Sequence, residues 1–186
     1  MTPNLLRRLC IRELRDLYSA ESQLVKALPK LANAAALPGL RAGLESHLRQ
    51  TRGRMVRLKR IFKALEESPK GGHCKSMEVL IKEGSEAIGK NRKEADARLV
   101  AAAWRVARYA MTRYGCARTY ATFLGENEAA RLLEKSLNEE KQMDANLNEL
   151  SESALLEVIE LGDSSLAEEG FRKYLAKSAR TKQRQR

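Results

Sequence analysis

Apolar residues at helical spacing run through most of this chain and constrain its fold more than any other feature. In the first segment, about residues 3 to 36, the apolar row comprises Leu6, Cys10, Leu14, Leu17, Leu24 and Leu28. Similar rows mark segments at about 40 to 67, 93 to 124 and 126 to 151, with a shorter amphipathic segment between 74 and 91. Because such rows form one face of an α-helix, the chain is predicted to be all-α.

The connections between these segments indicate how the helices are arranged. The motifs ALPGL at 36–40 and GEN at 125–127 are short turns and define two helical hairpins. The connection between the hairpins is longer and contains the short helix, whereas Pro29 is expected to kink the first helix without ending it. Two hairpins joined by one crossover are typical of a ferritin-like four-helix bundle.

The chain divides into one core domain and a C-terminal part. Residues 1–151 are predicted to form the bundle, since 186 residues with 43% apolar content can bury one core. Residues 152–176 are predicted to be a helical extension, because Ser165 and Glu168 form a capping-box pattern. Residues 177–186 hold five Lys/Arg and no acidic residue, and are predicted to be a basic, disordered tail.

Cysteine usage and the N-terminal sequence indicate the compartment. Cys10, Cys74 and Cys116 match no disulfide or zinc framework, so they are expected to be reduced thiols in a cytoplasmic protein. The N-terminal segment MTPNLLRRLCIRELRDL is interrupted by charges every few residues. Neither a signal peptide nor a membrane-spanning segment is therefore expected, and no membrane is expected as a partner.

The net charge of +11 is unevenly distributed. Residues 41–75 hold ten Lys/Arg against three Asp/Glu, whereas residues 126–170 hold thirteen Asp/Glu against three Lys/Arg. A basic face is expected on the second and third long helices, formed by Arg49, Arg52, Arg57, Arg60, Arg105 and Arg113. This face is consistent with an acidic partner or with non-specific association with nucleic acid. Oppositely charged helices packed within one chain or across a homodimer would explain the same distribution.

Acidic residues also occur inside the apolar rows. Glu21 falls within the arc of leucines on the first helix, and Glu140 and Asp144 lie one turn apart among the leucines of the fourth. His47 lies on the apolar face of the second helix, with Gln50 and Arg54 towards its edge. Because a buried carboxylate must be paired, protonated or metal-bound, three converging acids require a cation.

Five sequence blocks, in order, resemble one family. They are ELRDLYSAESQLVKALPKL, HLRQTRGRMVRLKRIF, CKSMEVLIKEG, YGCARTYATFLG and SLNEEKQMDANLNEL, and they span about residues 11–150. The blocks resemble the YciF/YciE-like branch of the ferritin-like superfamily. This resemblance implies a small bacterial four-helix bundle, often a homodimer, with a di-metal carboxylate centre of iron or manganese and a role in stress responses.

The chain departs from the family pattern at the metal ligands. Its third long helix reads Val106-Ala107-Arg108-Tyr109-Ala110 where the family reads approximately V-E-H-Y-E, so two carboxylates and a histidine are absent from this block. The second helix has His47-Leu48-Arg49-Gln50-Thr51 followed by Arg54, where the family has H-L-E-E-T or H-L-E-Q-T followed by Gln or His. The di-metal site is therefore predicted to be degenerate, and no cofactor is expected.

Two hypotheses remain for the retained acids. In the first, arginines neutralise them, with Arg54 the best candidate and Arg108 the second, because a guanidinium stays charged when buried and pairs bidentately with a carboxylate. The chain would then be a non-catalytic structural or interaction protein. In the alternative, Glu21, His47, Glu140 and Asp144 hold one iron or manganese ion.

Overall fold

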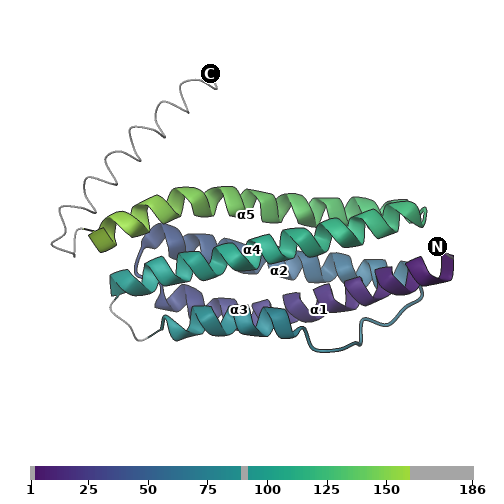
Figure 1. Ribbon diagram of the computed structural model, residues 1–186, viewed down its shortest axis with the longest axis horizontal. Helices are drawn as coiled ribbons and strands as arrows, with labels where there is room; N and C mark the ends of the chain where they lie inside the picture. The colour runs from purple at the N-terminus through teal and green to yellow at the C-terminus, as the bar shows by residue number, and fades with distance from the viewer. Residues whose placement is uncertain (1–2, 89–91, 160–186) are drawn as a thin grey trace, which may run out of the picture.

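The computed structural model describes residues 3–88 and 92–159, and every regular element in these ranges is a helix (Figure 1). The helices are α1 (Pro3–Ala34), α2 (Pro38–Ala64), α3 (Lys75–Glu86), α4 (Arg92–Phe123) and α5 (Asn127–Ile159). The all-α prediction is confirmed, and the helices begin and end within a few residues of the expected limits, except that α5 continues beyond residue 151.

Four long helices lie side by side and form the bundle (Figure 1). Within the hairpins, α1 packs on α2 and α4 packs on α5; between them, α1 contacts α4 and α2 contacts α5. The short helix α3 belongs to the crossover and lies against α1 and α4. Two hairpins joined by one crossover give the predicted ferritin-like bundle. Pro29 lies inside α1 and does not end it.

Each hairpin turn is held by specific backbone geometry. Pro38 opens α2 at a position where its missing N–H costs no helical hydrogen bond. The N–H groups of Ala36 and Leu37 donate to the carboxylate of Asp96 at 2.9 and 2.7 Å, which ties this turn to α4. Gly125 has a φ of +74° and closes the α4–α5 turn, a conformation that glycine adopts without steric cost.

The interior consists of two apolar clusters along the bundle axis. The first contains the second half of α1, the start of α2, α3, the start of α4 and the later part of α5, with Leu28, Leu44 and Leu147 among its members. The second contains the start of α1, the end of α2, the end of α4 and the start of α5, with Leu14 and Leu133 among its members. On α1, α2 and α5, the buried charged residues Glu21, Arg54 and Glu140 lie in sequence between members of the two clusters.

Some details differ from the sequence-based expectations. In the short amphipathic segment expected between 74 and 91, the helix ends at Glu86, and Ile88 just beyond it is 44% exposed. The boundary expected at residue 151 falls inside α5, whereas the expected terminal helix and basic tail lie mostly or wholly in residues 160–186, outside the described residues. In the described ranges, no helix combines the length and apolar character needed to cross a bilayer.

Candidate functional site: a buried arginine–carboxylate layer

Charged side chains from three helices meet between the two apolar clusters. Glu21 on α1, Arg54 on α2 and Glu140 on α5 are at most 1% exposed. Each lies on the apolar face of its helix, so packing of the amphipathic helices carries the charge into the interior. Arg54 was expected at the edge of that face, but it is fully buried because Thr51 and Leu58, one turn away on either side, are also buried.

The guanidinium of Arg54 contacts both carboxylates. Its Nε donates a hydrogen bond to Oε1 of Glu21 at 2.8 Å. Its Nη2 donates to Oγ1 of Thr51 at 2.8 Å and lies 2.7 Å from Oε1 of Glu140. The contact with Glu140 is close enough for an ion pair but is not aligned as a hydrogen bond. Arg54 therefore joins α2 to both α1 and α5. We call these three charged residues the Arg54 layer.

Polar groups from α2, α4 and α5 surround the Arg54 layer. The hydroxyl of Tyr114 donates to Oε1 of Glu21 at 2.8 Å, and Nε2 of His47 lies 3.5 Å from Oε1 of Glu140. Glu139 lies 3.6 Å from Nη1 of Arg54 and also pairs with Arg57. Each of the two buried carboxylates thus has a second polar neighbour besides the guanidinium.

The two buried carboxyl groups differ in their affinity for a proton. Burial raises the pKa of Glu21, and the nearby Glu140 adds to this effect, so that Arg54 offsets it only in part. Burial also acts to raise the pKa of Glu140, but the attraction of Arg54 and then of His47 outweighs it and lowers the pKa. Since one guanidinium faces two carboxyl groups, Glu21 takes up a proton more readily than Glu140.

Asp144 does not join the Arg54 layer. It was expected to face the interior, but the structure places its side chain at the bundle edge, 19% exposed and 3.0 Å from Nε of Arg108. Arg108 is 62% exposed and lies over the ring of Trp104. Asp144 points away from the core because Met143 and Leu147 occupy the inward-facing positions of that part of α5. Arg108 therefore neutralises an acid at the surface rather than in the core.

The α4 block in which the family resemblance implies metal ligands contributes methyl groups to the interior. Ala107 and Ala110 are buried, at 0% and 3% exposure, and Gln50 on α2 is partly buried. The guanidinium of Arg54 lies within 2.8 Å of both Glu21 and Glu140 and would repel a metal cation there. In the described ranges, no three His, Cys, Asp or Glu side chains are grouped as metal ligands. These residues do not fit a di-metal centre.

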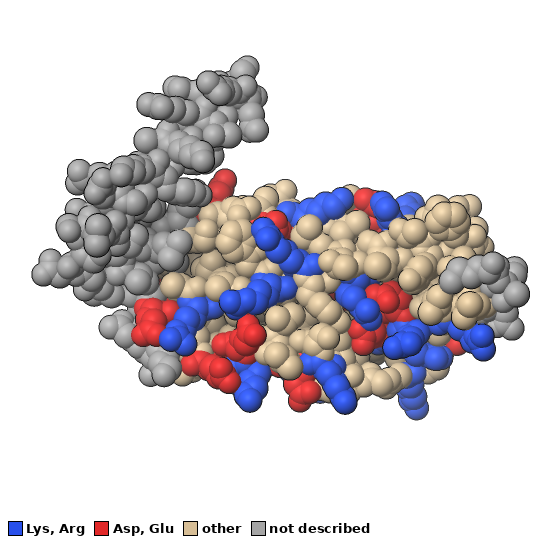
Figure 2. Space-filling model, in the orientation of Figure 1, with Lys and Arg blue, Asp and Glu red and all other residues tan. Residues whose placement is uncertain are grey.

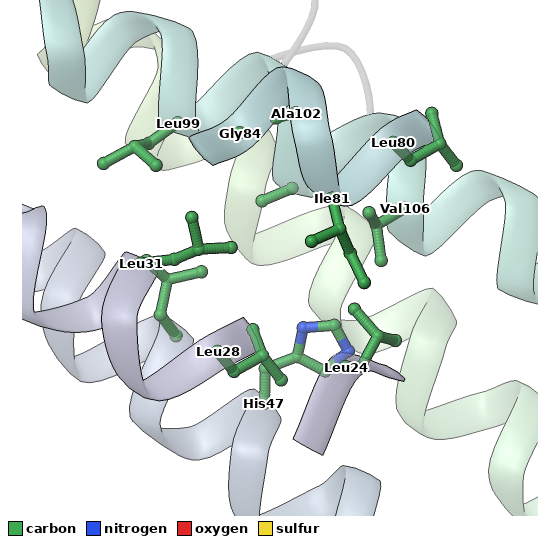
Figure 3. Close-up of a pocket in the computed structure, with 12 residues that line it drawn as sticks. Leu24, Leu28, Leu31, His47, Leu80, Ile81, Gly84, Leu99, Ala102 and Val106 are labelled. Atoms are coloured by element: carbon green, nitrogen blue, oxygen red, sulfur yellow. The ribbon is translucent and has the colours of Figure 1, made fainter. Parts of the chain in front are cut away.

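His47 has a second side that faces an apolar pocket (Figure 3). The pocket lies between α1, α2, α3 and α4 and has a volume of about 20 Å³. It is lined by side chains that include Leu24, Leu28, Ile81 and Val106. One water molecule would fit such a volume, but a buried water needs two to four polar partners and His47 alone cannot supply them. The pocket is too small and too apolar for a cofactor.

Two polar residues of the interior were not recognised from the sequence. The hydrogen bond of Tyr114 to Glu21 joins residues 93 positions apart, which no local pattern reveals. Asp96 is 1% exposed and caps the α1–α2 turn. Its place within an apolar row of α4, between Ala95 and Leu99, was the available signal.

A second polar cluster lies at the start of α3. The Sγ atom of Cys74 lies 3.1 Å from the hydroxyl of Tyr109, which donates to Asp16 at 3.1 Å. Arg113 pairs with the same aspartate. His73, next to Cys74 in sequence, instead lies at the surface and pairs with Glu78. The cluster links α1, α3 and α4, and its polar groups bond to one another.

A four-helix bundle with one crossover and carboxylates on facing inner surfaces defines the ferritin-like class. The family model described as "Domain of unknown function (DUF892)" matches residues 6–160, and the chain belongs to this family. Protein YciF of Escherichia coli (strain K12) is 39% identical over 144 residues, which cover 76% of this chain and 87% of YciF.

Solved structures agree with this assignment. The crystal structure of the E. coli stress protein YciF matches with a TM-score of 0.78 and 36% identity, over 81% of this chain and 96% of YciF. YcfI from Rhodopseudomonas palustris, for which a structural role has been suggested, matches with a TM-score of 0.74 and 39% identity. The match covers 80% of this chain and 94% of YcfI. A Xanthomonas campestris protein shares the fold, with a TM-score of 0.68 and 18% identity. The match covers 83% of this chain and 96% of that protein.

Proposed function

We propose that this chain is a stress-associated, non-catalytic structural member of its family, in which the guanidinium of Arg54 takes the place of a metal cation. The observation that carries the proposal is the position of Arg54, buried and in contact with Glu21 and Glu140 on two other helices. A fixed positive charge there neutralises acids that would otherwise need a bound ion.

Three further features support a structural role. Ala107 and Ala110 fill the inward positions of the α4 block with methyl groups, which are not metal ligands. Asp144 is paired with Arg108 at the bundle edge. Oxygen activation at di-metal carboxylate centres uses two ions held by several carboxylates and histidines, and the side chains of the Arg54 layer supply too few ligands for this.

The relatives support the biological part of the proposal. YciF of E. coli, similar over most of this chain, is a stress protein. YcfI from R. palustris, at 39% identity, is the relative for which a structural role has been suggested. A bundle held by an internal ion pair suits such a role because its stability does not depend on the supply of iron or manganese.

Metal analysis tests this proposal directly. The full chain is purified without chelator, incubated with Fe²⁺ or Mn²⁺, desalted and measured by elemental analysis. We expect well below one equivalent of metal per chain, because Arg54 competes for both carboxylates. About two equivalents, as a di-metal carboxylate centre would hold, would overturn the proposal.

A variant that restores the family pattern provides the positive control. It carries Arg54→His, Ala107→Glu, Arg108→His and Ala110→Glu, while a matched variant carries the three α4 substitutions and keeps Arg54. If Arg54 is the obstacle, the four-substitution variant gains metal and the three-substitution variant gains much less. Equal metal binding by both variants would show that the guanidinium does not exclude the ion.

One observation favours the alternative of a single metal ion. Both ring nitrogens of His47 lack a hydrogen-bond partner among the described residues, and Nε2 lies 3.5 Å from Glu140. A lone ion would need Arg54 to move away from Glu21 and Glu140, with Asp144 turned inward as a further ligand. Metal–oxygen distances of about 2.0 to 2.2 Å in crystals soaked with Mn²⁺ would establish this alternative.

The homodimer expected from the family resemblance remains a prediction, which sedimentation equilibrium would test.

A further inference from the structure

The outer face of α2 carries a row of cations without partners in the described part of the chain. Arg49, Arg52, Lys59 and Lys63 are exposed, and no described carboxylate lies within 4.0 Å of their nitrogens. We call these four residues the α2 basic stripe. Their steps of three, seven and four residues place them on one side of the helix. At 1.5 Å per residue, the stripe extends about 21 Å.

Many charges on other faces of the molecule are paired within the chain. On the face that carries α3 and α4, Lys/Arg and Asp/Glu side chains interleave (Figure 2), and Arg105 pairs there with Glu83. On α5, Glu128, Glu134 and Glu139 pair with arginines of this chain. Glu149 is exposed, and no described Lys or Arg nitrogen lies within 4.0 Å of it. The four cations of the α2 basic stripe, in contrast, have no carboxylate partner among the described residues, and their row fits a polyanion from outside.

We propose that the α2 basic stripe binds double-stranded nucleic acid through its phosphates, without regard to base sequence. This inference goes beyond the structural role proposed above and does not depend on the Arg54 layer. A straight row of about 21 Å runs along roughly six base pairs of duplex, taking 3.4 Å per phosphate of one strand. Long, exposed Lys and Arg side chains can contact phosphates, and contacts to phosphates carry no sequence information.

The composition of the same face argues against other polyanionic partners. Val56, at 67% exposure, is the one large apolar side chain exposed on α2, so this face lacks the apolar surface that an interfacial membrane helix inserts. Phe62 is the one aromatic residue of α2 and is buried, so no aromatic platform is present for stacking the bases of a single strand.

Fluorescence anisotropy with two unrelated duplexes tests the proposal on the full chain. The stripe variant carries Arg49→Gln, Arg52→Gln, Lys59→Gln and Lys63→Gln. The matched control loses the same charge from exposed lysines of other helices, through Lys30→Gln, Lys82→Gln, Lys135→Gln and Lys141→Gln. Circular dichroism establishes that both variants fold. A third variant replaces the five cations of the C-terminal tail, Lys177, Arg180, Lys182, Arg184 and Arg186, by Gln.

We expect the wild type to bind both duplexes equally, and its affinity to fall about a hundredfold between about 50 and 200 mM salt, as four phosphate contacts would require. The stripe variant should lose at least about tenfold in affinity and show a shallower salt dependence, while the control keeps most of its binding. The inference is overturned by absence of binding at low salt, by equal loss in the control, by loss in the tail variant alone, by a preference for one duplex, or by binding only to anionic phospholipid vesicles.

Discussion

Arg54 and Arg108 each pair with an acid of α5, but their surroundings differ completely. Arg54 is 0% exposed and contacts Glu21 and Glu140, whereas Arg108 is 62% exposed and contacts Asp144. Both arginines lie in blocks where the family resemblance implies metal ligands, on α2 and α4. An arginine–carboxylate pair therefore occurs once in the core and once at the surface, and burial decides how much each pair contributes to the stability of the fold.

The physical reason is the cost of removing charge from water. An exposed ion pair contributes about 0 to 1 kcal/mol, since water solvates both partners when they separate. A buried pair gains little net stability over apolar residues, yet removal of one partner costs about 3 to 5 kcal/mol because the other charge stays in the interior without compensation. The Arg54 layer is thus expected to be sensitive to single substitutions, and the surface pair is not.

The largest effect is expected for Arg54→Ala, which leaves Glu140 ionised without its main partner. The free energy of unfolding should fall by about 3 to 5 kcal/mol, measured by urea denaturation at neutral pH. The control is Arg49→Ala on the exposed face of α2, which should change stability by less than about 0.5 kcal/mol. Similar small losses for both variants would mean that Arg54 is hydrated in solution.

The second prediction compares the loss of stability when each of the two buried carboxyl groups is replaced by an amide. Glu140→Gln removes the group that the lowered pKa identifies as ionised, and should cost about 2 to 3 kcal/mol because Arg54 keeps only part of its compensation. Glu21→Gln mimics a protonated carboxyl group and keeps an oxygen that can accept from Tyr114, so it should cost less than about 1 kcal/mol. Equal costs at neutral pH would contradict this assignment of the charge.

The third prediction concerns how this difference varies with pH. The folded-state pKa of Glu21 is raised, so its contribution is fully present below the unfolded pKa near 4.5 and is lost as the pH rises through the folded pKa. Glu21→Gln should therefore gain stability relative to the wild type with rising pH. Glu140 has a lowered pKa, so its contribution is present above the unfolded value and lost as the pH falls through the folded pKa. Urea denaturation between pH 4 and 8 measures both trends, and a constant difference between wild type and Glu21→Gln would refute the first.

The smallest effect is expected for Asp144→Asn at the bundle edge. This substitution removes the charge that faces Arg108 but keeps the packing of Arg108 over Trp104. The cost should be about 0.2 to 1 kcal/mol at low salt and should vanish near 1 M salt, where charges are screened within about 3 Å. A loss above about 2 kcal/mol, unaffected by salt, would place Asp144 in the buried layer after all.

The helices could be predicted from the sequence because each apolar row is a local pattern. The burial of Glu21 and Glu140 followed from the same rows. The position of Asp144 could not be predicted in this way. The step of four residues from Glu140 to Asp144 turns the side chain by about 40° around the helix axis, and the neighbouring Met143 then occupies the inward position. The contact of Tyr114 with Glu21 depends on how α4 packs against α1, which the sequence of neither helix specifies.

The Arg54 layer also restricts the helices to one axial alignment. If α2 slid along α1 by one turn, about 5.4 Å, leucines would still meet leucines in both apolar clusters. Arg54 would then face Leu17 or Leu24 instead of Glu21, and each such displaced bundle would contain an unpaired charge in its interior. The unpaired charge makes misaligned bundles less stable than the native one. The layer therefore favours one packing of the helices over its alternatives, which aliphatic side chains alone would not do.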